Sequence, residues 1–304
     1  MIEIALVNNM PDAALDATER QFRTLLAAAA GDLDVRLALY SLPEIPRSEF
    51  GRRRTSRYAN IDELWSRRYD GLIVTGTEPQ ADDLQDEPYW GSLTRLLDWA
   101  ERATRSTILS CLAAHAGILH LDGISRRRLE GKRIGVFECT RGAEHPLTKS
   151  AQDRLRMPHS RWNDVPEEAL HACGYSILIR SPEAGVDMFV KHRNSLFVFF
   201  QGHPEYDAVM LLLEYRRDIG RYLRGERDTY PSTPRGYFDE DIERELASLR
   251  NRALRDRRED LLVEFPIEAA AGRVVNNWRA SAEAVYRNWL AYIEAAKLQQ
   301  LCPV

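Results

Sequence analysis

The sequence predicts an α/β protein whose mostly parallel sheet is flanked by helices, with extra helices at the C-terminal end. Two observations support this fold class. Short apolar runs typical of buried strands alternate with longer amphipathic segments typical of helices, and this alternation favours a parallel sheet covered on both faces. In addition, 44% of the 304 residues are hydrophobic, which is enough to form a large core.

The first part of the chain supplies most of the alternation. Strands are predicted at residues 2–7, 33–40, 71–75 and 107–110, and helices at 14–30, at 87–103 and directly after Cys111. The helix at 14–30 is amphipathic, with its apolar side formed by Leu15, Phe22, Leu25 and Leu26.

The second part of the chain mixes closely spaced strands with helices. Strands are predicted at residues 134–138, 174–180, 186–191 and 195–200. Because these runs follow one another closely, we expect some antiparallel pairing among them. A helix is predicted from Ala208, a highly charged one at about 239–262 and a last one at about 277–297. The mixed charges of the middle helix are typical of a solvated surface. We expect residues 1–304 to form a single domain.

Composition excludes several classes of function. The net charge of −4 and the isoelectric point of about 6.0 argue against a nucleic-acid-binding surface. No run approaches the roughly 18 apolar residues of a membrane span, and the first residues lack the features of a signal peptide. The cysteines are too widely spaced for a zinc motif or a disulfide framework. We therefore expect a cytoplasmic protein without a metal that acts on small molecules. The four cysteines are Cys111, Cys139, Cys173 and Cys302.

Cys111 lies where a predicted strand turns into an alanine-rich helix. A thiol at the start of a helix is close to the positive end of the helix dipole, which favours the thiolate. The free backbone N–H groups of the first helical turn, beginning with Leu112, can hold an oxyanion. The alternative is a buried structural cysteine, which is the usual role of a free thiol.

His203 and Glu205 follow the predicted strand at 195–200 within the string Gly202-His203-Pro204-Glu205. Residues two apart in an extended segment lie on the same side, so the carboxylate can orient the imidazole and stabilise its charged form. A lone histidine without a special role is the alternative. With Cys111 at a neighbouring strand end, the three side chains predict a site for acyl transfer through a cysteine nucleophile.

Short sequence motifs along nearly the whole chain indicate a family. The chain resembles the homoserine O-succinyltransferase family, whose fold is similar to that of class I glutamine amidotransferases and is flavodoxin-like. The strings that carry the resemblance include residues 7–11, 70–76, 88–90, 110–111, 135–138, 158–161, 184–186, 202–207, 278–279 and 288–290. The combination of Pro-His-Ser-Arg at 158–161 with Gly-His-Pro-Glu-Tyr-Asp at 202–207 is the most specific part.

The resemblance implies roles for individual residues. Cys111 corresponds to the nucleophile that accepts the acyl group, His203 to its base and Glu205 to the acid that orients the base. Arg217 corresponds to the arginine that holds the carboxylate of the amino-acid substrate, a role that suits a guanidinium.

Four further positions carry expectations from the same resemblance. Lys132 and Ser160 correspond to substrate-contacting residues, and the N–H of Asn9 to a donor in the oxyanion hole beside that of Leu112. Gln80 occupies the position that tends to separate members, glycine for succinyl and glutamate for acetyl transfer. Because a neutral amide does not repel a succinyl carboxylate, Gln80 favours succinyl.

The activity implied by the resemblance is acyl-CoA-dependent O-acylation of homoserine, or of a related hydroxy amino acid such as serine. It follows a ping-pong course through a Cys111 thioester, with succinyl-CoA or acetyl-CoA as co-substrate, no permanently bound cofactor, and a possible homodimer. One alternative is a glutamine amidotransferase-like hydrolase, although Leu109 and Ala113 stand where its Gly-x-Cys-x-Gly elbow has glycines. The other is a non-catalytic binding module on the same fold.

Overall fold

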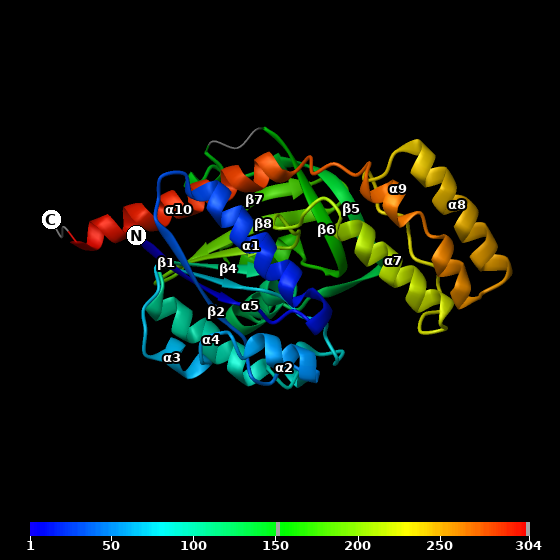
Figure 1. Cartoon of the computed structure of the whole chain (residues 1–304). Helices are drawn as coiled ribbons and strands as arrows, with labels where there is room; N and C mark the ends of the chain where they lie inside the picture. Colours follow the sequence, from blue (N-terminus) through cyan, green and yellow to red (C-terminus); the bar gives the residue numbers. More distant parts are fainter. Residues whose placement is uncertain (150–152, 302–304) are drawn as a thin grey trace.

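The computed structural model describes residues 1–149 and 153–301 of the chain, so Cys302 lies outside the described residues. Its centre is a nine-stranded sheet with the strand order β2-β1-β3-β4-β9-β8-β7-β5-β6. Helices cover both faces of this sheet, as the alternation in the sequence predicts (Figure 1). The α/β fold class with a large parallel region is therefore confirmed.

The parallel half of the sheet is formed by short, almost entirely apolar runs. These strands are β2 (Val35–Tyr40), β1 (Ile2–Val7), β3 (Gly71–Val74), β4 (Ser106–Ser110) and β9 (Leu196–Phe200). β4 and β9 pair in parallel, with Ser110 opposite Phe200. Because their carboxyl ends coincide, Cys111 and the turn that begins at Gln201 start side by side, and this edge is where ligands bind in open α/β sheets.

The other half of the sheet is antiparallel, as the close spacing of the later strands predicts. It contains β8 (Gly185–His192), β7 (Ser176–Ser181), β5 (Arg127–Arg141) and β6 (Arg154–Asp164). β5 is much longer than the predicted strand at 134–138. No strand was predicted where β6 lies, and β6 carries the Pro-His-Ser-Arg string.

Two apolar cores lie between the sheet and its helices. On one face, α1 (Leu15–Ala30) packs beside the long C-terminal helix α10 (Arg279–Leu301). The other face is covered by α4 (Trp90–Ala103) and α5 (Leu112–Asp122). The short helices α3 (Ile61–Trp65) and α6 (Glu167–Ala172) pack into the same core. The short helix α2 (Glu49–Thr55) instead contacts α1 through the ion pair of Arg54 with Asp16. In residues 1–149 and 153–301 no helix is both long and apolar enough to cross a membrane.

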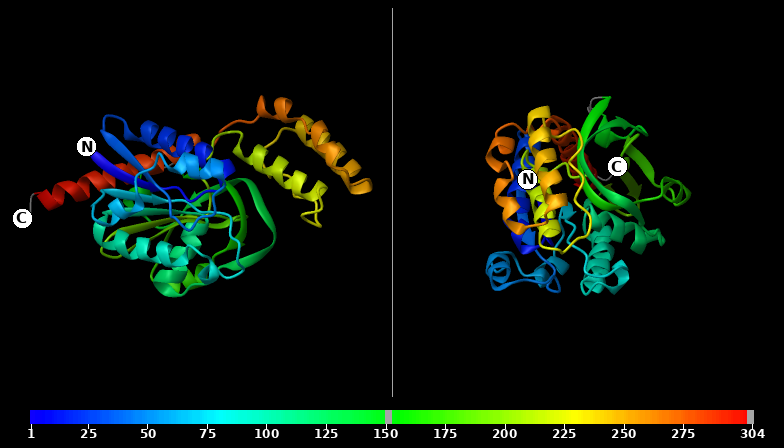
Figure 2. Two further views of the ribbon diagram at one scale, coloured as in Figure 1. Left: turned by 60° about the horizontal axis from the view of Figure 1, so that its bottom comes forward. Right: turned by 90° about the vertical axis from the view of Figure 1, so that its right-hand side faces the viewer.

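A third apolar core lies at one end of the sheet, opposite the chain termini (Figure 2). It is formed by α7 (Met210–Leu223), α8 (Glu240–Arg255) and α9 (Ile267–Ala271). The charged helix predicted at 239–262 ends at Arg255, and a 3-10 helix follows at Glu259–Glu264. α8 exposes its charges but buries Ile242, Leu246, Leu249 and Ala253 on one side.

Candidate active site

Cys111 is held in a strained conformation at the junction of β4 and α5. Its φ of 53° and ψ of −111° make it the one non-glycine residue with positive φ among the described residues. Such a backbone costs on the order of 1–3 kcal/mol, and it persists where the surrounding structure imposes it. Here the Cys111 N–H donates to the Phe200 carbonyl oxygen at 2.7 Å, which fixes the turn to β9. Cys111 is half-buried and lines the main cavity of the protein.

His203 and Glu205 form a buried pair beside this thiol. Nδ1 of His203 lies 2.8 Å from Oε1 of Glu205. Burial lowers the pKa of His203, but the charge of Glu205 and the charge and hydrogen bond of Cys111 outweigh it and hold the pKa well above its usual value. Because Glu205 occupies Nδ1, Nε2 is the nitrogen left for the sulfur. The arrangement favours an imidazolium beside the sulfur.

Three consecutive backbone N–H groups anchor the turn that carries His203. The N–H of Gln201 donates to the Asp187 carbonyl oxygen at 2.9 Å, and that of Gly202 to Asp187 Oδ1 at 2.9 Å. The N–H of His203 donates to the Pro158 carbonyl oxygen at 2.8 Å. A Cβ on Gly202 would lie 2.6 Å from Asp187 Oδ1, so only glycine fits this close approach.

Tyr206 connects the imidazole to a second group of side chains. Its ring stacks on that of His203, with centroids 4.2 Å apart and planes 14° apart. Its hydroxyl donates to Glu214 Oε1 at 2.6 Å. Burial, followed by the charge of Glu214, raises the pKa of Tyr206 well above its usual value, so the phenol keeps the proton that it donates.

Glu214 is the centre of a buried charged cluster. Lys132 Nζ lies 3.3 Å from Glu214 Oε2 and 2.6 Å from Asp218 Oδ2. Ser160 also donates to Glu214, and Arg217 lies 3.2 Å from Asp218 Oδ1. Burial opposes the charge of Glu214, but Lys132, Arg217 and the two hydroxyl donors prevail and lower its pKa to about 2. The predicted residues Lys132, Ser160 and Arg217 thus meet around two acids that the sequence analysis missed.

One cavity of about 760 Å³ joins the two groups. Its wall contains the predicted residues Cys111, His203, Glu205, Lys132, Ser160 and Arg217. Arg217 retains 47% side-chain exposure and offers the cavity a guanidinium, which can bind a carboxylate through two hydrogen bonds. The same cavity is therefore lined by the Cys111 sulfur and by a guanidinium suited to an anion.

The two predicted oxyanion donors are placed differently. The N–H of Leu112 belongs to the first turn of α5, where no partner exists within the helix. A Cβ on Gly76 would lie 3.1 Å from this nitrogen, so the loop after β3 passes directly beside it. The N–H of Asn9, in contrast, donates to Thr75 Oγ1 at 2.8 Å, and the neighbours Met10 and Pro11 line the cavity in its place.

Gln80 lies away from the described residues that line the cavity. It is exposed, and its backbone N–H donates to Glu87 Oε1 at 2.6 Å. Glu78 of the same loop does line the cavity and pairs with Arg221 at 2.8 Å. In this arrangement the loop meets the cavity through Glu78.

A family model for homoserine O-succinyltransferase matches residues 1–299. The chain belongs to the homoserine O-succinyltransferase family. A protein of that name from Rhodopseudomonas palustris is 50% identical over 95% of this chain and 87% of its own length. Another from Bradyrhizobium japonicum is 46% identical over 96% of this chain and 90% of its own length. The chain is accordingly an acyltransferase of this family, as its motifs predict.

Solved glutamine amidotransferases share the fold of this family member. One from Thermotoga maritima has a TM-score of 0.51 and 16% identity, covering 96% of this chain and 98% of its own. One from Methylobacillus flagellatus has a TM-score of 0.52 and 17% identity, covering 96% and 94%. At these identities the likeness concerns the fold alone, and it confirms the predicted glutamine amidotransferase-like architecture.

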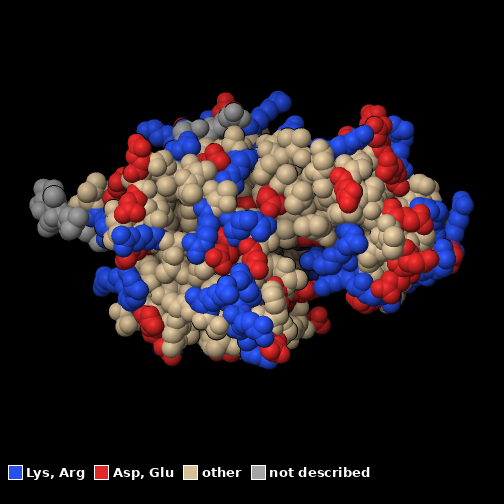
Figure 3. Space-filling view, in the orientation of Figure 1, with Lys and Arg blue, Asp and Glu red and all other residues tan. Residues whose placement is uncertain are grey.

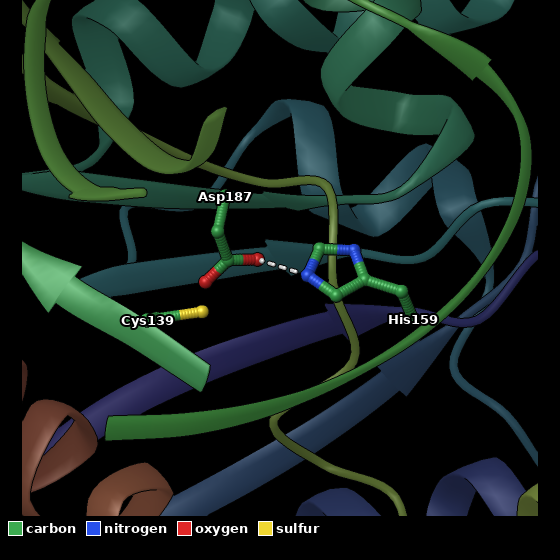
Figure 4. Close-up of side chains that lie close together, drawn as sticks. All are labelled: Cys139, His159 and Asp187. Atoms are coloured by element: carbon green, nitrogen blue, oxygen red, sulfur yellow. Dashed lines mark ion pairs between the residues drawn. The ribbon is translucent and has the colours of Figure 1, made fainter. Parts of the chain in front are cut away.

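The sequence analysis missed a second cluster of side chains (Figure 4). Potential ligand atoms of Cys139, His159 and Asp187 lie within 4.8 Å of one another, and all three residues are buried. Arg161 Nε donates to His159 Nδ1 at 3.3 Å, which leaves the proton of the neutral imidazole on Nε2, the atom 3.4 Å from Asp187 Oδ1. A ligating histidine usually donates from its other nitrogen. This cluster therefore fits a support for the Asp187–Gly202 bond better than a metal site.

Proposed function

We propose that this protein transfers a succinyl group from succinyl-CoA to the side-chain hydroxyl of homoserine through a thioester on Cys111. The observation that carries the proposal is the convergence of Cys111, His203 and Glu205 at adjoining strand ends, in a cavity shared with Arg217. The succinyl group and homoserine come from the name shared by the family model and the curated relatives.

In the first half-reaction, the Cys111 thiolate attacks the carbonyl carbon of succinyl-CoA. We assign the oxyanion that forms to the N–H of Leu112, which begins α5. The bond to the CoA sulfur then breaks, and the imidazolium of His203 gives its Nε2 proton to the departing sulfur. CoA leaves, and the succinyl group remains on Cys111 as a thioester.

In the second half-reaction, homoserine occupies the space that CoA has left. We assign its carboxylate to Arg217, which keeps exposed N–H groups at the cavity. Neutral His203 takes the proton of the homoserine hydroxyl, the oxygen attacks the thioester, and the Cys111 thiolate departs. The enzyme returns to its starting protonation state.

The choice of succinyl rests on the family name, with Gln80 as a proposed contributor. Since Gln80 lies outside the described cavity wall, its contribution requires the loop 76–81 to approach the bound acyl chain. Serine is the second candidate acceptor, because it offers the same carboxylate and hydroxyl with one carbon fewer.

We also propose that the chain forms a single domain and a homodimer. A single cooperative unfolding transition would support one domain, and the mass of the protein in solution tests the homodimer.

The experiment identifies the acyl donor and the acceptor in two separate steps. The protein is first acylated with succinyl-CoA or acetyl-CoA in the absence of an amino acid, and the excess donor is removed. Homoserine, serine or water alone is then added, and loss of the adduct is followed by intact mass. We expect succinyl-CoA to acylate faster and homoserine to discharge the adduct fastest. Faster discharge by serine would reassign the acceptor, and ammonia release from glutamine would favour the amidotransferase alternative.

A further inference from the structure

Two arginines near the mouth of the cavity share one aromatic partner. The guanidinium carbon of Arg128 lies 4.7 Å from the ring centroid of Trp162, and that of Arg227 lies 5.0 Å from it. All three residues line the same cavity as Cys111. They come from β5, from β6 and from the segment between α7 and α8, so the fold joins distant parts of the chain at this point.

These arginines differ from their neighbours in having no ion-pair partner among the described residues. Within residues 1–149 and 153–301, neither Arg128 nor Arg227 has a carboxylate within ion-pair distance, whereas Arg221 pairs with Glu78 and Arg217 with Asp218. Stacking on an indole holds a guanidinium in place while its N–H groups stay free at the edge. Two such groups present a fork of donors that suits phosphate oxygens.

Exposure separates this position from the site of chemistry. Arg128 is exposed and Arg227 is half-buried, while His203 and Glu205 are buried beside the half-buried Cys111. The phosphates of CoA are separated from the thioester by the long pantetheine arm, so they belong at the open end of the cavity. Two exposed acids of the same wall, Glu130 and Asp228, are also unpaired among the described residues. The face of the molecule in Figure 3 is likewise of mixed charge, so we infer that the stacked arginines act through local contacts.

We propose that Arg128 and Arg227, held against Trp162, bind the phosphate groups of the CoA donor. This inference rests on the proposed function only for the identity of the donor. It makes Trp162 a positioning residue that orders both guanidinium groups before CoA arrives. The carboxylate of a succinyl chain is another anion that these arginines could bind. Donors that carry phosphate, carboxylate or both distinguish the two ligands.

The experiment measures the rate of Cys111 acylation with three donors in Arg128→Gln, Arg227→Gln and the double variant. Succinyl-CoA carries both phosphates and a carboxylate, acetyl-CoA carries phosphates alone, and the N-acetylcysteamine thioester of succinate carries a carboxylate alone. We expect each substitution to lower the second-order rate with either CoA donor about 10-fold, as for a lost hydrogen bond to a charged group. The rate with the N-acetylcysteamine thioester is expected to stay within about twofold of wild type, since it lacks the phosphates.

Arg224→Gln is the matched control. Arg224 is an exposed arginine of the same segment that pairs with Glu226 and is absent from the cavity wall among the described residues, so its loss should leave all three rates unchanged. Equal losses with all three donors, or losses confined to the succinyl donors, would overturn the assignment to phosphate. If the double variant is acylated at the wild-type rate by all three donors, the assignment is overturned as well.

A binding measurement keeps this proposal distinct from the proposed function. Titration of CoA itself, followed by calorimetry, requires no acyl transfer. Weaker binding of CoA to the double variant, with unchanged binding to Arg224→Gln, supports the phosphate site even if no donor acylates Cys111. Equal CoA affinity in wild type and double variant refutes the phosphate site even if acylation proceeds as proposed.

Discussion

Replacing Glu205 by glutamine tests how the imidazole of His203 is controlled. The substitution keeps the shape of the side chain but removes the negative charge 2.8 Å from Nδ1. Both side chains are more than nine-tenths buried, so water screens the pair weakly. A hydrogen bond to a charged group contributes about 1.5–3 kcal/mol, which corresponds to a fall of about 10- to 150-fold in the rate of thioester formation.

The pH dependence of the same variant has a defined sign. Glu205 is the largest of the influences that raise the pKa of His203, and burial lowers it. Without Glu205 the imidazolium therefore loses its proton at a lower pH than in the wild type. Because this proton goes to the departing CoA sulfur, the alkaline limb of the rate profile should move toward lower pH.

The assay is single-turnover acylation of Cys111 by succinyl-CoA, quenched and read by intact mass across the neutral and alkaline range. Glu168→Gln, which removes an exposed carboxylate, is the control for net charge. The melting temperature of each variant shows that the fold is retained. A Glu205→Gln rate within twofold of wild type at neutral pH, with the alkaline limb in place, would refute the role given to this carboxylate.

Three further substitutions have defined outcomes. Tyr206→Phe keeps the stack on His203 but removes the bond to Glu214, so we expect the KM for homoserine to rise about 10-fold while the rate of acylation by succinyl-CoA stays within about twofold of wild type. Gly202→Ala places a Cβ 2.6 Å from an oxygen of Asp187, so the turn must move and kcat should fall at least about 10-fold. Lys132→Met leaves two buried carboxylates without their shared cation, and urea unfolding should show a loss of about 3–5 kcal/mol.

Each of these three predictions has an outcome that would contradict it. Equal losses in both half-reactions would show that Tyr206 does not act through Glu214. Gly131→Ala, at a glycine whose Cβ would meet nothing within 4 Å, should have little effect, and a loss as large as that of Gly202→Ala would remove the steric explanation. An unfolding free energy of Lys132→Met within 1 kcal/mol of wild type would be too small for a buried ion pair.

The sequence predicted the catalytic end of the sheet because its strands are simple. β4 and β9 are short apolar runs, each followed directly by a reactive residue or turn, and parallel strands bring their carboxyl ends together. β6 was missed although Leu155 and Met157 alternate with arginines, as in a half-buried strand, because Pro158 follows them. A proline inside a run argues against a strand in sequence analysis.

The charged cluster and the loop positions depend on contacts that one sequence does not specify. Glu214 and Asp218 lie four residues apart on one side of α7, so a signal was present, but such pairs are usually exposed and gave no reason to expect burial. Which N–H groups face the cavity depends on the path of each loop after its strand. The bond from Asn9 to Thr75 shows that a donor named from a motif can be turned toward another partner.

The central claim is that Cys111 carries the acyl group, and intact mass spectrometry after incubation with succinyl-CoA tests it most directly. We expect wild type and Cys173→Ala, which removes another half-buried thiol, to gain the mass of one succinyl group. Cys111→Ala should gain none. An adduct that persists in Cys111→Ala, or that peptide mapping places on another residue, would contradict the account.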